Sequence, residues 1–335
     1  MTNRTELGAA TVGLGVGEQH ARALVATRRC ALRWVFDLDP AKASRLAADL
    51  GARAASRFED ILDDGDVQIV TLASYDDAHY KQTLAALGAG KHVFVEKPLC
   101  RSLDELHHVK AAWQQSGRHL AANLVLRGAP LYQWLRDAIS AGDLGEVYAI
   151  DGDYLYGRLH KITEGWRKDV PDYSVMQGGG VHMVDLMLWL TRQRPASVTA
   201  AASAIATRGT AFRYHDFQAA TYRFESGLIG RITANFGAVH PHQHVLRVFG
   251  TRATFLHDDR GARLQMSREP GAGWTPINRS PLPDSKGVLI APFVDSIVER
   301  RDRGAQTQQE FDLIAACLAA DRAAGSGVSE TIAYV

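Results

Sequence analysis

Residues 9–17 of this 335-residue chain read AATVGLGVG, and this segment decides the fold of the first third. Its apolar start predicts a β-strand over Ala9–Leu14, and the pattern of His20–Thr27 predicts the helix that follows. A glycine-rich turn between strand and helix lets the backbone approach a pyrophosphate, which then lies on the open N–H groups of the helix N-terminus. The segment therefore predicts a dinucleotide site, with a tight turn that binds no ligand as the alternative.

The three glycines of this turn depart from the usual G-x-G-x-x-G spacing, because Gly17 comes one place early and Glu18 stands where the third glycine is expected. Asp37 closes the next predicted strand, 20 residues after Gly17. An acidic side chain there accepts hydrogen bonds from an adenosine ribose and repels a 2′-phosphate, which favours NAD over NADP. The contacts expected in this turn are Gly13, Gly15, Val16, Gly17 and Asp37.

Short apolar runs alternate with helical patterns up to about residue 125. Further strands are predicted at Leu32–Asp37, Val67–Ala73, His92–Val95 and Leu120–Asn123, and helices at Pro40–Leu50, Tyr80–Gly88 and Leu103–Ser116. Such alternation requires crossover connections and predicts an α/β domain with a doubly wound parallel sheet, a Rossmann fold. We place this NAD-binding domain at residues 1–125.

The pattern changes after Arg127, where strand-like runs follow one another closely. Strands are predicted at Glu146–Tyr156, Ser197–Ala204, Gln218–Phe224, Leu228–Ala234, Val245–Phe249 and Thr254–His257, and helices at Pro130–Ala141, Val181–Leu190, Phe293–Arg301 and Thr307–Ala323. Consecutive strands without intervening helices favour an open, mostly antiparallel sheet. We expect residues 126–335 to form an α+β domain for substrate binding and oligomerisation.

Composition narrows the classes of partner. Lys and Arg number 38 against 37 Asp and Glu, so a formal net charge of +1 argues against nucleic acid. No apolar run reaches the roughly 18 residues that cross a bilayer, and the N-terminus has no signal-peptide pattern. Three scattered cysteines fit a reducing compartment. We expect a cytoplasmic protein that binds neither membrane nor nucleic acid.

A second motif, Glu96-Lys97-Pro98, follows the predicted strand His92–Val95. In an open parallel sheet, ligands bind beyond the carboxyl ends of the strands, so Lys97 belongs to the edge where a nicotinamide would lie. A partly desolvated lysine there suits acid–base work on a hydroxyl, and a loop lysine paired with Glu96 is the alternative. Ser74, His79, Glu96 and Lys97 complete the expected cofactor contacts, and Asn123 is expected at the same edge to bind substrate.

Taken in order, these motifs make the chain similar to the glucose–fructose oxidoreductase, inositol dehydrogenase and rhizopine-catabolism group of NAD(P)-dependent oxidoreductases. The marks that carry the resemblance are Gly13-Leu14-Gly15 with His20, Asp37, Ala89-Gly90-Lys91-His92-Val93 before Glu96-Lys97-Pro98, Asn123 with Arg127 and Pro130, Gly142-Asp143-Leu144-Gly145-Glu146-Val147, and His182-Met183-Val184-Asp185. The resemblance implies hydride transfer at a secondary alcohol of a sugar, cyclitol or nucleotide sugar. It also implies that Lys97 is catalytic or orients the substrate, and that the protein is a homodimer or homotetramer.

Three glycines lead into the helix that carries His182 and Asp185. These two residues are three apart, so they share one helix face. An imidazole near its neutral pKa can take the proton of a hydroxyl while hydride leaves the same carbon, and Asp185 would bind another hydroxyl. The alternative is a histidine paired with its own carboxylate, beside glycines that serve only close packing.

The position four residues before His182 departs from the family pattern. Many dehydrogenases that this chain resembles carry an aspartate there, in a relay with the lysine and the histidine, whereas this chain has Gly178. Asp172 would reach the site only if the loop before the glycines folds back. The proton could therefore pass to His182 alone, to Lys97, or to a tyrosine such as Tyr156.

Aromatic and basic residues crowd the segment between Tyr154 and Lys168. Tyr156 and Arg167 are expected to bind substrate, because such groups stack on a sugar or uracil face and hold a diphosphate or carboxylate. This favours a nucleotide-sugar or acidic-sugar substrate, with a strand edge that carries solvated charges as the alternative. The alternating His240, His242 and His244 would share one face of a strand, but no carboxylate accompanies them and hydride transfer needs no metal, so no metal site is expected.

The sequence thus predicts an NAD-dependent dehydrogenase in which His182 accepts a proton and Lys97 stabilises the alkoxide. An NADPH-dependent reductase of a keto-sugar is the first alternative. The second is a dinucleotide-binding sensor or scaffold without catalysis, which the glycine at position 178 would explain.

Overall fold

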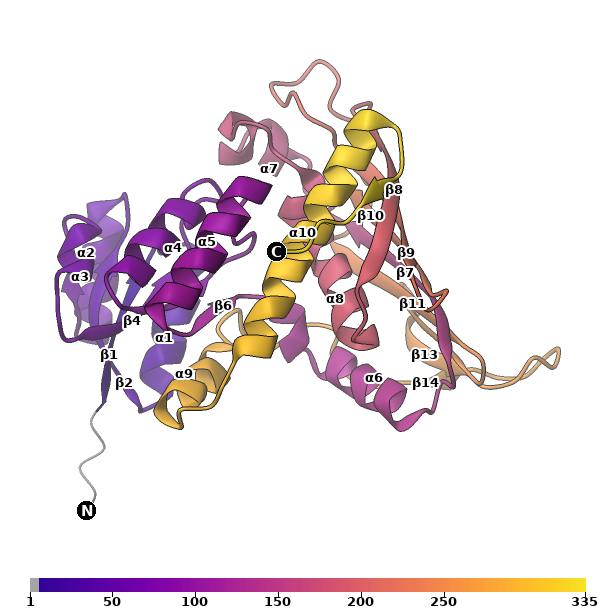
Figure 1. Cartoon of the computed structure of the whole chain (residues 1–335), viewed down its shortest axis with the longest axis horizontal. Coiled ribbons are helices and arrows are strands. Elements are labelled where there is room, and N and C mark those ends of the chain that lie inside the picture. The colour runs from indigo at the N-terminus through magenta and orange to yellow at the C-terminus, as the bar shows by residue number, and fades with distance from the viewer. Residues whose placement is uncertain (1–5) are drawn as a thin grey trace. The chain divides into compact units, whose positions relative to one another are not determined.

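The computed structural model describes residues 6–335 and divides the chain into two compact units (Figure 1). The first unit contains the chain up to Val125 together with Pro283–Phe311 and Val335, and the second contains Leu126–Leu282 and Asp312–Tyr334. The expectation that residues 126–335 form one domain is therefore wrong for Pro283–Phe311, which packs with the first unit.

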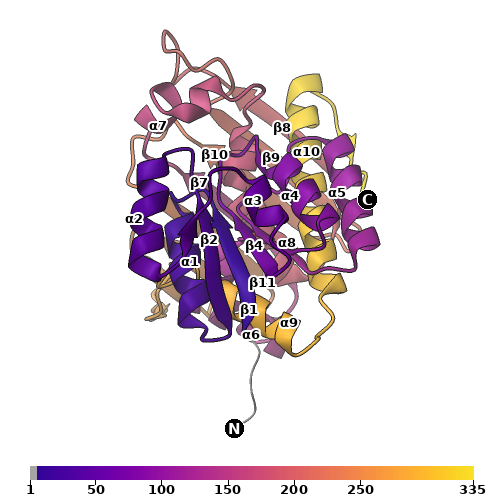
Figure 2. The ribbon, with the colours of Figure 1, turned by 90° about the vertical axis from the view of Figure 1, so that its left-hand side faces the viewer.

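Six parallel strands form the sheet of the first unit in the order β3-β2-β1-β4-β5-β6. The order runs outward from β1 in both directions, and Figure 2 shows α1 and α2 on one side of these strands and α4 and α5 on the other. This is the predicted doubly wound fold. The strands are β1 (Leu7–Val12), β2 (Cys30–Phe36), β3 (Arg53–Ala54), β4 (Val67–Leu72), β5 (His92–Val95) and β6 (Leu120–Ala122), and the helices are α1 (Gly17–Ala26), α2 (Pro40–Leu50), α3 (Glu59–Leu62), α4 (His79–Gly88), α5 (Leu103–Ser116) and α9 (Ile290–Val298).

Helix α2 illustrates how local sequence sets these bounds. The Asp39 carboxylate accepts hydrogen bonds from the N–H groups of Ala41 and Lys42, and Pro40 takes the first helical position, where no donor is needed. Gly51 ends the helix with φ +68°, a left-handed conformation that costs glycine little. The bounds agree with the prediction of Pro40–Leu50.

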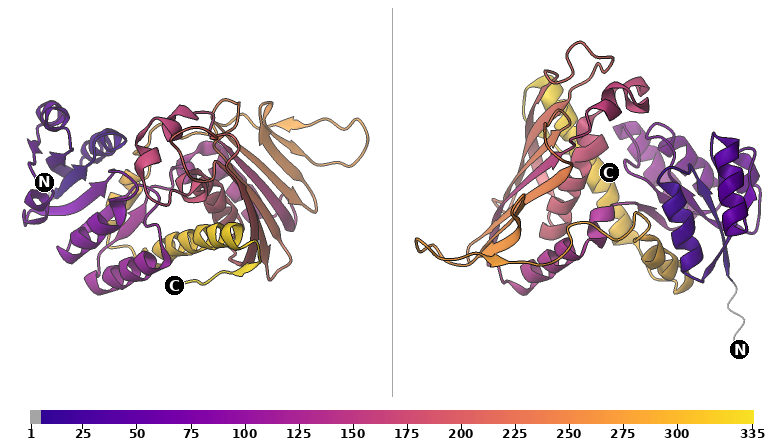
Figure 3. Two further views of the ribbon diagram at one scale, coloured as in Figure 1. Left: turned by 90° about the horizontal axis from the view of Figure 1, so that it is seen from above. Right: turned by 180° about the vertical axis from the view of Figure 1, so that it is seen from behind.

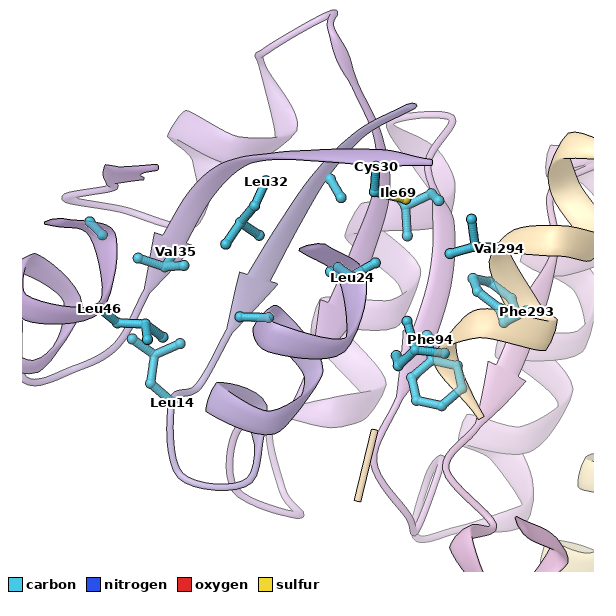
Figure 4. Packing of buried hydrophobic residues seen from close by; sticks show 14 of the residues in the cluster. Leu14, Leu24, Cys30, Leu32, Val35, Leu46, Ile69, Phe94, Phe293 and Val294 are labelled. Atoms are coloured by element: carbon cyan, nitrogen blue, oxygen red, sulfur yellow. The ribbon is translucent and has the colours of Figure 1, made fainter. Parts of the chain in front are cut away.

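The core of the first unit explains why Pro283–Phe311 belongs to it. Phe293 and Val294 of α9 are fully buried and pack with Leu24, Ile69 and Phe94 (Figure 4). The rings of Phe94 and Phe293 lie with centroids 5.4 Å apart. Burying a phenylalanine contributes about 1.5–3 kcal/mol, so these side chains hold α9 on the unit although the sequence separates them widely.

The second unit is built on a nine-stranded sheet in the order β14-β13-β12-β11-β7-β10-β9-β8-β15. Among these pairs only β10 with β7 is parallel, which confirms a mostly antiparallel sheet. The strands are β7 (Val147–Leu155), β8 (Pro195–Ser203), β9 (Phe217–Phe224), β10 (Ile229–Asn235), β11 (Gln243–Gly250), β12 (Thr254–Asp258), β13 (Gly261–Gln265), β14 (Thr275–Pro276) and β15 (Glu330–Thr331).

Helices cover one face of this sheet. They are α6 (Pro130–Ala141), α8 (Val181–Thr191) and the later turns of α10 (Gly304–Ser326), while the short α7 (His160–Thr163) lies in a connection. The yellow C-terminal helix α10 runs along that face in both views of Figure 3, and the Tyr222 hydroxyl of β9 donates to its Ala316 carbonyl at 3.3 Å. On the strands themselves, partly exposed ion pairs such as Asp151–Arg231 link β7 to β10.

Within residues 6–335, no helix combines the length and apolarity needed to cross a membrane. All three cysteines, Cys30, Cys100 and Cys317, are buried thiols without a disulfide.

Candidate functional site

The glycine turn lies directly after β1. Gly13 has φ +78°, and a Cβ built there would lie 2.5 Å from the Ala73 carbonyl oxygen, so only glycine fits. A Cβ on Gly15, by contrast, would meet no atom within 4 Å. Gly13 thus lies against the end of β4, whereas Gly15 has open space beside it. A ligand can therefore approach the backbone of Gly15.

Asp37 holds this turn from the end of β2. Its carboxylate accepts hydrogen bonds from the N–H groups of Leu14 (2.6 Å) and Asp39 (3.0 Å), and the Lys42 ammonium lies 3.5 Å away. Burial acts to raise the pKa of Asp37, but the backbone donors and Lys42 outweigh it and lower the pKa. The carboxylate is therefore ionised at neutral pH, the form that accepts from ribose hydroxyls.

Helix α1 begins beside this carboxylate without a side-chain cap at Val16. Of its first N–H groups, that of Gln19 donates to the Val16 carbonyl at 2.9 Å, and the macrodipole places partial positive charge at this end of the helix. A Cβ built on Gly17 would lie 3.1 Å from side-chain carbons of both Thr11 and Ala73, so this glycine allows close packing of α1 against the strands. The glycine turn, the N-terminus of α1 and the Asp37 carboxylate together form a site that fits a dinucleotide.

A buried polar cluster lies at the carboxyl ends of β5 and β6. Glu96 accepts hydrogen bonds from the Asn123 amide (2.7 Å), and its carboxylate lies 3.3 Å from His20 Nε2. Burial acts to raise the pKa of Glu96, but His20, the charge of Lys97 and the Asn123 amide together lower it to about 2. Glu96 is therefore an ionised anchor, and half-buried Lys97 follows it at the edge where the sequence placed it.

The expected substrate-binding role of Asn123 stays a prediction. Asn123 is 1% exposed, and its amide nitrogen donates to Glu96 and to the Lys286 carbonyl at 2.8 Å. The amide nitrogen thus joins β6 to β5 and to the segment after Pro283, whereas the buried amide oxygen has no hydrogen-bond partner among the described residues. Asn123 thus positions Glu96, and through it the strand end that carries Lys97.

His79, expected to contact the cofactor, joins two loops in the structure. Its ring is fully buried, with Nδ1 at 2.8 Å from the Pro98 carbonyl and Nε2 at 3.1 Å from the Ser74 carbonyl. Both nitrogens thus link the loops after β4 and β5, and a contact of His79 with the cofactor stays a prediction. The Ser74 hydroxyl, in turn, donates to Gln82 at 2.5 Å.

In the second unit, His182 lies in the first turn of α8 among aromatic rings. It is 8% exposed, stacks on Tyr154 with centroids 6.0 Å apart and meets His244 edge-on at 5.8 Å. Tyr154 also packs against Phe236, and burial raises its pKa well above the ordinary value despite the nearby charges of Arg158 and Arg167. Tyr154 is thus uncharged and packs beside His182 and Phe236. The sequence analysis did not predict this packing role.

Asp185, expected to bind a substrate hydroxyl, is paired with Arg127 in the structure. It is 1% exposed, and Arg127 donates to both of its oxygens, with Nη2 to Oδ1 at 2.6 Å. Burial raises the pKa of Asp185 even though Arg127 acts to lower it. The pair joins α8 to the turn before α6, so Asp185 fixes the helix that carries His182.

Tyr156 and Arg167 both lie against this aromatic group. Tyr156 is 4% exposed, packs on Phe236 with centroids 4.4 Å apart and carries the Arg158 guanidinium over its ring at 4.6 Å. Arg167 stacks over Trp166 at 4.3 Å. The two cations lie against these rings, and the buried Nε of Arg158 has no hydrogen-bond partner among the described residues. Substrate binding by Tyr156 and Arg167 stays a prediction.

The loop before α8 does fold back, but it does not bring Asp172 to the site. Asp172 is exposed, with φ +50°, and its neighbour Tyr173 turns inward to 5% exposure. The chain then passes through a π-helical turn, Met176–Gly180, before α8 begins. Ser174 anchors the turn by donating to Asp321 of α10 at 2.8 Å.

The three alternating histidines do not share a face. His240 lies 3.2 Å from Asp259, whereas His242 and His244 have ring centroids 4.9 Å apart and both meet Tyr154 edge-on. The reason is that β11 begins only at Gln243, so the first two histidines lie in the preceding loop. Among residues 6–335 no group of three His, Cys, Asp or Glu side chains is arranged to hold a metal ion.

Comparisons with known proteins follow the same division of the chain. A model described as an oxidoreductase family with an NAD-binding Rossmann fold, GFO_IDH_MocA, matches residues 7–124, and the GFO/IDH/MocA C-terminal domain matches residues 132–256.

Individual relatives agree with these matches. A 1,5-anhydro-D-fructose reductase of Ensifer adhaerens is 32% identical over 44% of this chain and 45% of that protein, and inositol 2-dehydrogenase 2 of Saccharopolyspora erythraea is 31% identical over 56% and 55%. The matched region spans about half the length of these relatives. The structure of a levoglucosan dehydrogenase in complex with NADH superposes with a TM-score of 0.86 at 18% identity, covering 99% of this chain and 100% of that one, which shows a shared fold.

Proposed function

Because the chain belongs to the GFO/IDH/MocA family of oxidoreductases, we propose that it is an NAD-dependent dehydrogenase that transfers hydride at a secondary alcohol of a sugar or cyclitol. The observation that carries this proposal is the glycine turn, open at Gly15 and held by the ionised Asp37. Gly13, Val16 and Gly17 would cradle the pyrophosphate, and Asp37 would accept from the ribose. NAD, when bound, supplies the hydride acceptor.

Lys97 and His182 carry the proposed acid–base chemistry. Lys97 lies in the first unit at the carboxyl end of β5, next to the ionised Glu96, and would stabilise negative charge that develops on the substrate oxygen. His182, buried beside neutral rings in the second unit, would accept the hydroxyl proton. Each role rests on that residue's own surroundings.

The aromatic group around Tyr156 supports a ring-shaped substrate, since sugar faces stack on such side chains. Arg158 and Arg167 at its border favour a substrate that also carries a carboxylate or phosphate, such as an acidic or nucleotide sugar. The names of the relatives point instead to neutral inositol and anhydrofructose as substrates of those proteins. A substrate panel has to contain both kinds.

The test measures NADH formation with NAD and myo-inositol, D-glucose, D-glucuronate or UDP-glucose, and NADH consumption with 1,5-anhydro-D-fructose. Turnover with one of them, lost at least 100-fold in both Lys97→Ala and His182→Ala, is the expected result. Wild-type rates in both variants would reject these roles. NADH binding without turnover on any substrate would favour the sensor alternative.

The remaining assignments follow the same proposal. Three buried free thiols suit a reducing cytoplasm, and a near-zero net charge gives no pull toward nucleic acid. We expect a homodimer or homotetramer that pairs through the exposed face of the nine-stranded sheet. Sedimentation as a monomer at micromolar concentration would contradict that assembly.

A further inference from the structure

Two side chains in the segment before α8 meet one carboxylate of the C-terminal helix α10. The Ser174 hydroxyl donates to Asp321 Oδ1 and the Gln177 amide donates to Asp321 Oδ2, both at 2.8 Å. Each oxygen of the carboxylate thus receives a donor. The proposed chemistry uses none of these three residues, yet together they join α10 to the π-helical turn Met176–Gly180.

This turn contains three glycines in a row and packs closely on its neighbours. A Cβ built on Gly179 would collide with the Tyr154 ring, and one built on Gly180 would lie 2.5 Å from the Met176 sulfur. The glycines allow this packing but contribute no side chain that could hold the turn, and glycine loses more backbone freedom on folding than other residues. Side chains that flank the glycines therefore matter for the shape of the turn.

Ser174 passes the contact with α10 on to the backbone of the turn. Its hydroxyl oxygen accepts the Gln177 N–H at 3.1 Å while the hydroxyl donates to Asp321, and its carbonyl accepts the Gly178 N–H at 2.8 Å. The turn continues directly into α8, whose second residue is His182. The carboxylate on α10 thus orients the chain that leads to the imidazole.

The carboxyl group of Asp321 serves as an acceptor in these contacts. The Gln177 amide nitrogen can only donate, which matches an ionised carboxylate. Burial raises the pKa of Asp321, while the hydrogen bonds from Gln177 and Ser174 act to lower it. Gln177 is 7% exposed, and its Oε1 has no hydrogen-bond partner among the described residues, so the amide nitrogen is the atom through which it binds α10.

We propose that Asp321 is a positioning residue for His182. Its carboxylate holds Ser174 and Gln177, and through them the glycine turn, so that the first turn of α8 keeps the imidazole in its place against Tyr154. No proton or other atom is transferred to Asp321. The inference rests on the proposed function for the role of His182, whereas the contact between α10 and the turn exists with or without turnover.

The first experiment detects this contact without substrate, by hydrogen exchange of residues 174–183 at pH 8. Asp321→Leu has a side chain of similar size without acceptors, and exchange should become at least tenfold faster. Gln177→Glu combined with Asp321→Asn reverses the direction of the hydrogen bond and should restore the wild-type rate. Arg322→Leu, at the exposed neighbouring position of α10, should not change it. Equal rates in the wild type and in Asp321→Leu would overturn the proposal.

The second experiment measures the consequence for the reaction, with whichever panel substrate the wild type turns over. Asp321→Leu should lower kcat about tenfold per NADH-binding site, with KM within twofold, because a misplaced imidazole reacts slowly. A loss of stability alone would lower the number of NADH-binding sites and leave kcat per site unchanged, which would overturn the proposal. The exchanged pair Gln177→Glu with Asp321→Asn should recover kcat.

Two additions keep the test decisive. If Asp321→Leu does not fold, Ser174→Ala with Gln177→Met removes the two donors instead and should give the same losses. If the wild type turns over no panel substrate, the His182 signal of ¹⁵N-histidine-labelled protein, assigned by its loss in His182→Asn, replaces kcat. A signal that shifts in Asp321→Leu and returns in the exchanged pair then counts against the proposed function alone. A signal that does not shift rejects the positioning role.

Discussion

The substitution Glu96→Gln tests whether the ionised cluster after β5 supports the edge of the first sheet. The carboxylate accepts from Asn123 at 2.7 Å and lies 3.3 Å from His20. Glutamine keeps the size and shape of the side chain but cannot carry the charge. The variant should therefore lose the electrostatic part of the cluster while the packing around it stays the same.

The size of this loss follows from the pKa of Glu96, which falls from 4.5 to about 2 in the folded protein. A shift of about 2.5 units at 1.36 kcal/mol each corresponds to about 3 kcal/mol. Because the folded pKa is the lower one, this stabilisation is fully present above pH 4.5 and disappears as the pH falls through 2. Near pH 3 less than half of it, about 1.4 kcal/mol, should remain.

Hydrogen exchange in peptides covering β5 and β6, measured across a urea series at pH 7 and pH 3, reports this stability locally. Glu96→Gln should cost about 3 kcal/mol at pH 7 and markedly less at pH 3. Glu59→Gln, an exposed carboxylate at the start of α3, is the matched control and should cost under about 0.5 kcal/mol. An equal loss at both pH values would refute the electrostatic origin of the stabilisation.

Three further substitutions test the turn and the helix that carries His182. Gly13→Ala should cost about 2 kcal/mol and weaken NADH binding in a fluorescence titration, because alanine is strained at φ +78° and its Cβ meets the Ala73 carbonyl; wild-type affinity would contradict this. Asp37→Ala should narrow the preference for NADH over NADPH, and an unchanged ratio would remove Asp37 from the ribose site. Asp185→Asn should cost about 3–5 kcal/mol in thermal or urea unfolding, since it removes the buried carboxylate that pairs with the Arg127 guanidinium; adding Arg127→Met should restore part of it, and purely additive losses would argue against the pair.

The fold could be predicted because its signals are local. The apolar period, the proline at position 40 and Gly51 set the bounds of α2, and close-spaced strands after residue 195 indicated the second sheet. The membership of Pro283–Phe311 in the first unit could not be predicted. It depends on Phe293 meeting Phe94, a contact between residues about 200 apart in sequence that no periodic pattern encodes.

The candidate site, too, could be predicted where its contacts are local in sequence and could not where they depend on tertiary packing. Gly13 and Asp37 belong to one strand–turn–helix unit, so their spacing predicted their proximity. Asp185 and His79 were assigned to ligands because of their residue type and place in a motif. Their actual partners, the Arg127 guanidinium and the backbone carbonyls of two loops, are set by tertiary packing. A buried polar side chain takes the partner that packing brings to it, and sequence spacing does not reveal that partner.

Position 178 shows how this limit bears on function. Many dehydrogenases that this chain resembles have an aspartate where it has Gly178. The sequence offered Asp172 as a carboxylate that could replace it if the loop folded back. In the structure φ +50° at Asp172 turns its carboxylate outward and the next residue inward, so the polar group that fills the space is a phenol. A side chain at 178 would collide with this phenol, so close packing alone accounts for the glycine. Its presence therefore does not by itself favour a sensor that has lost catalysis.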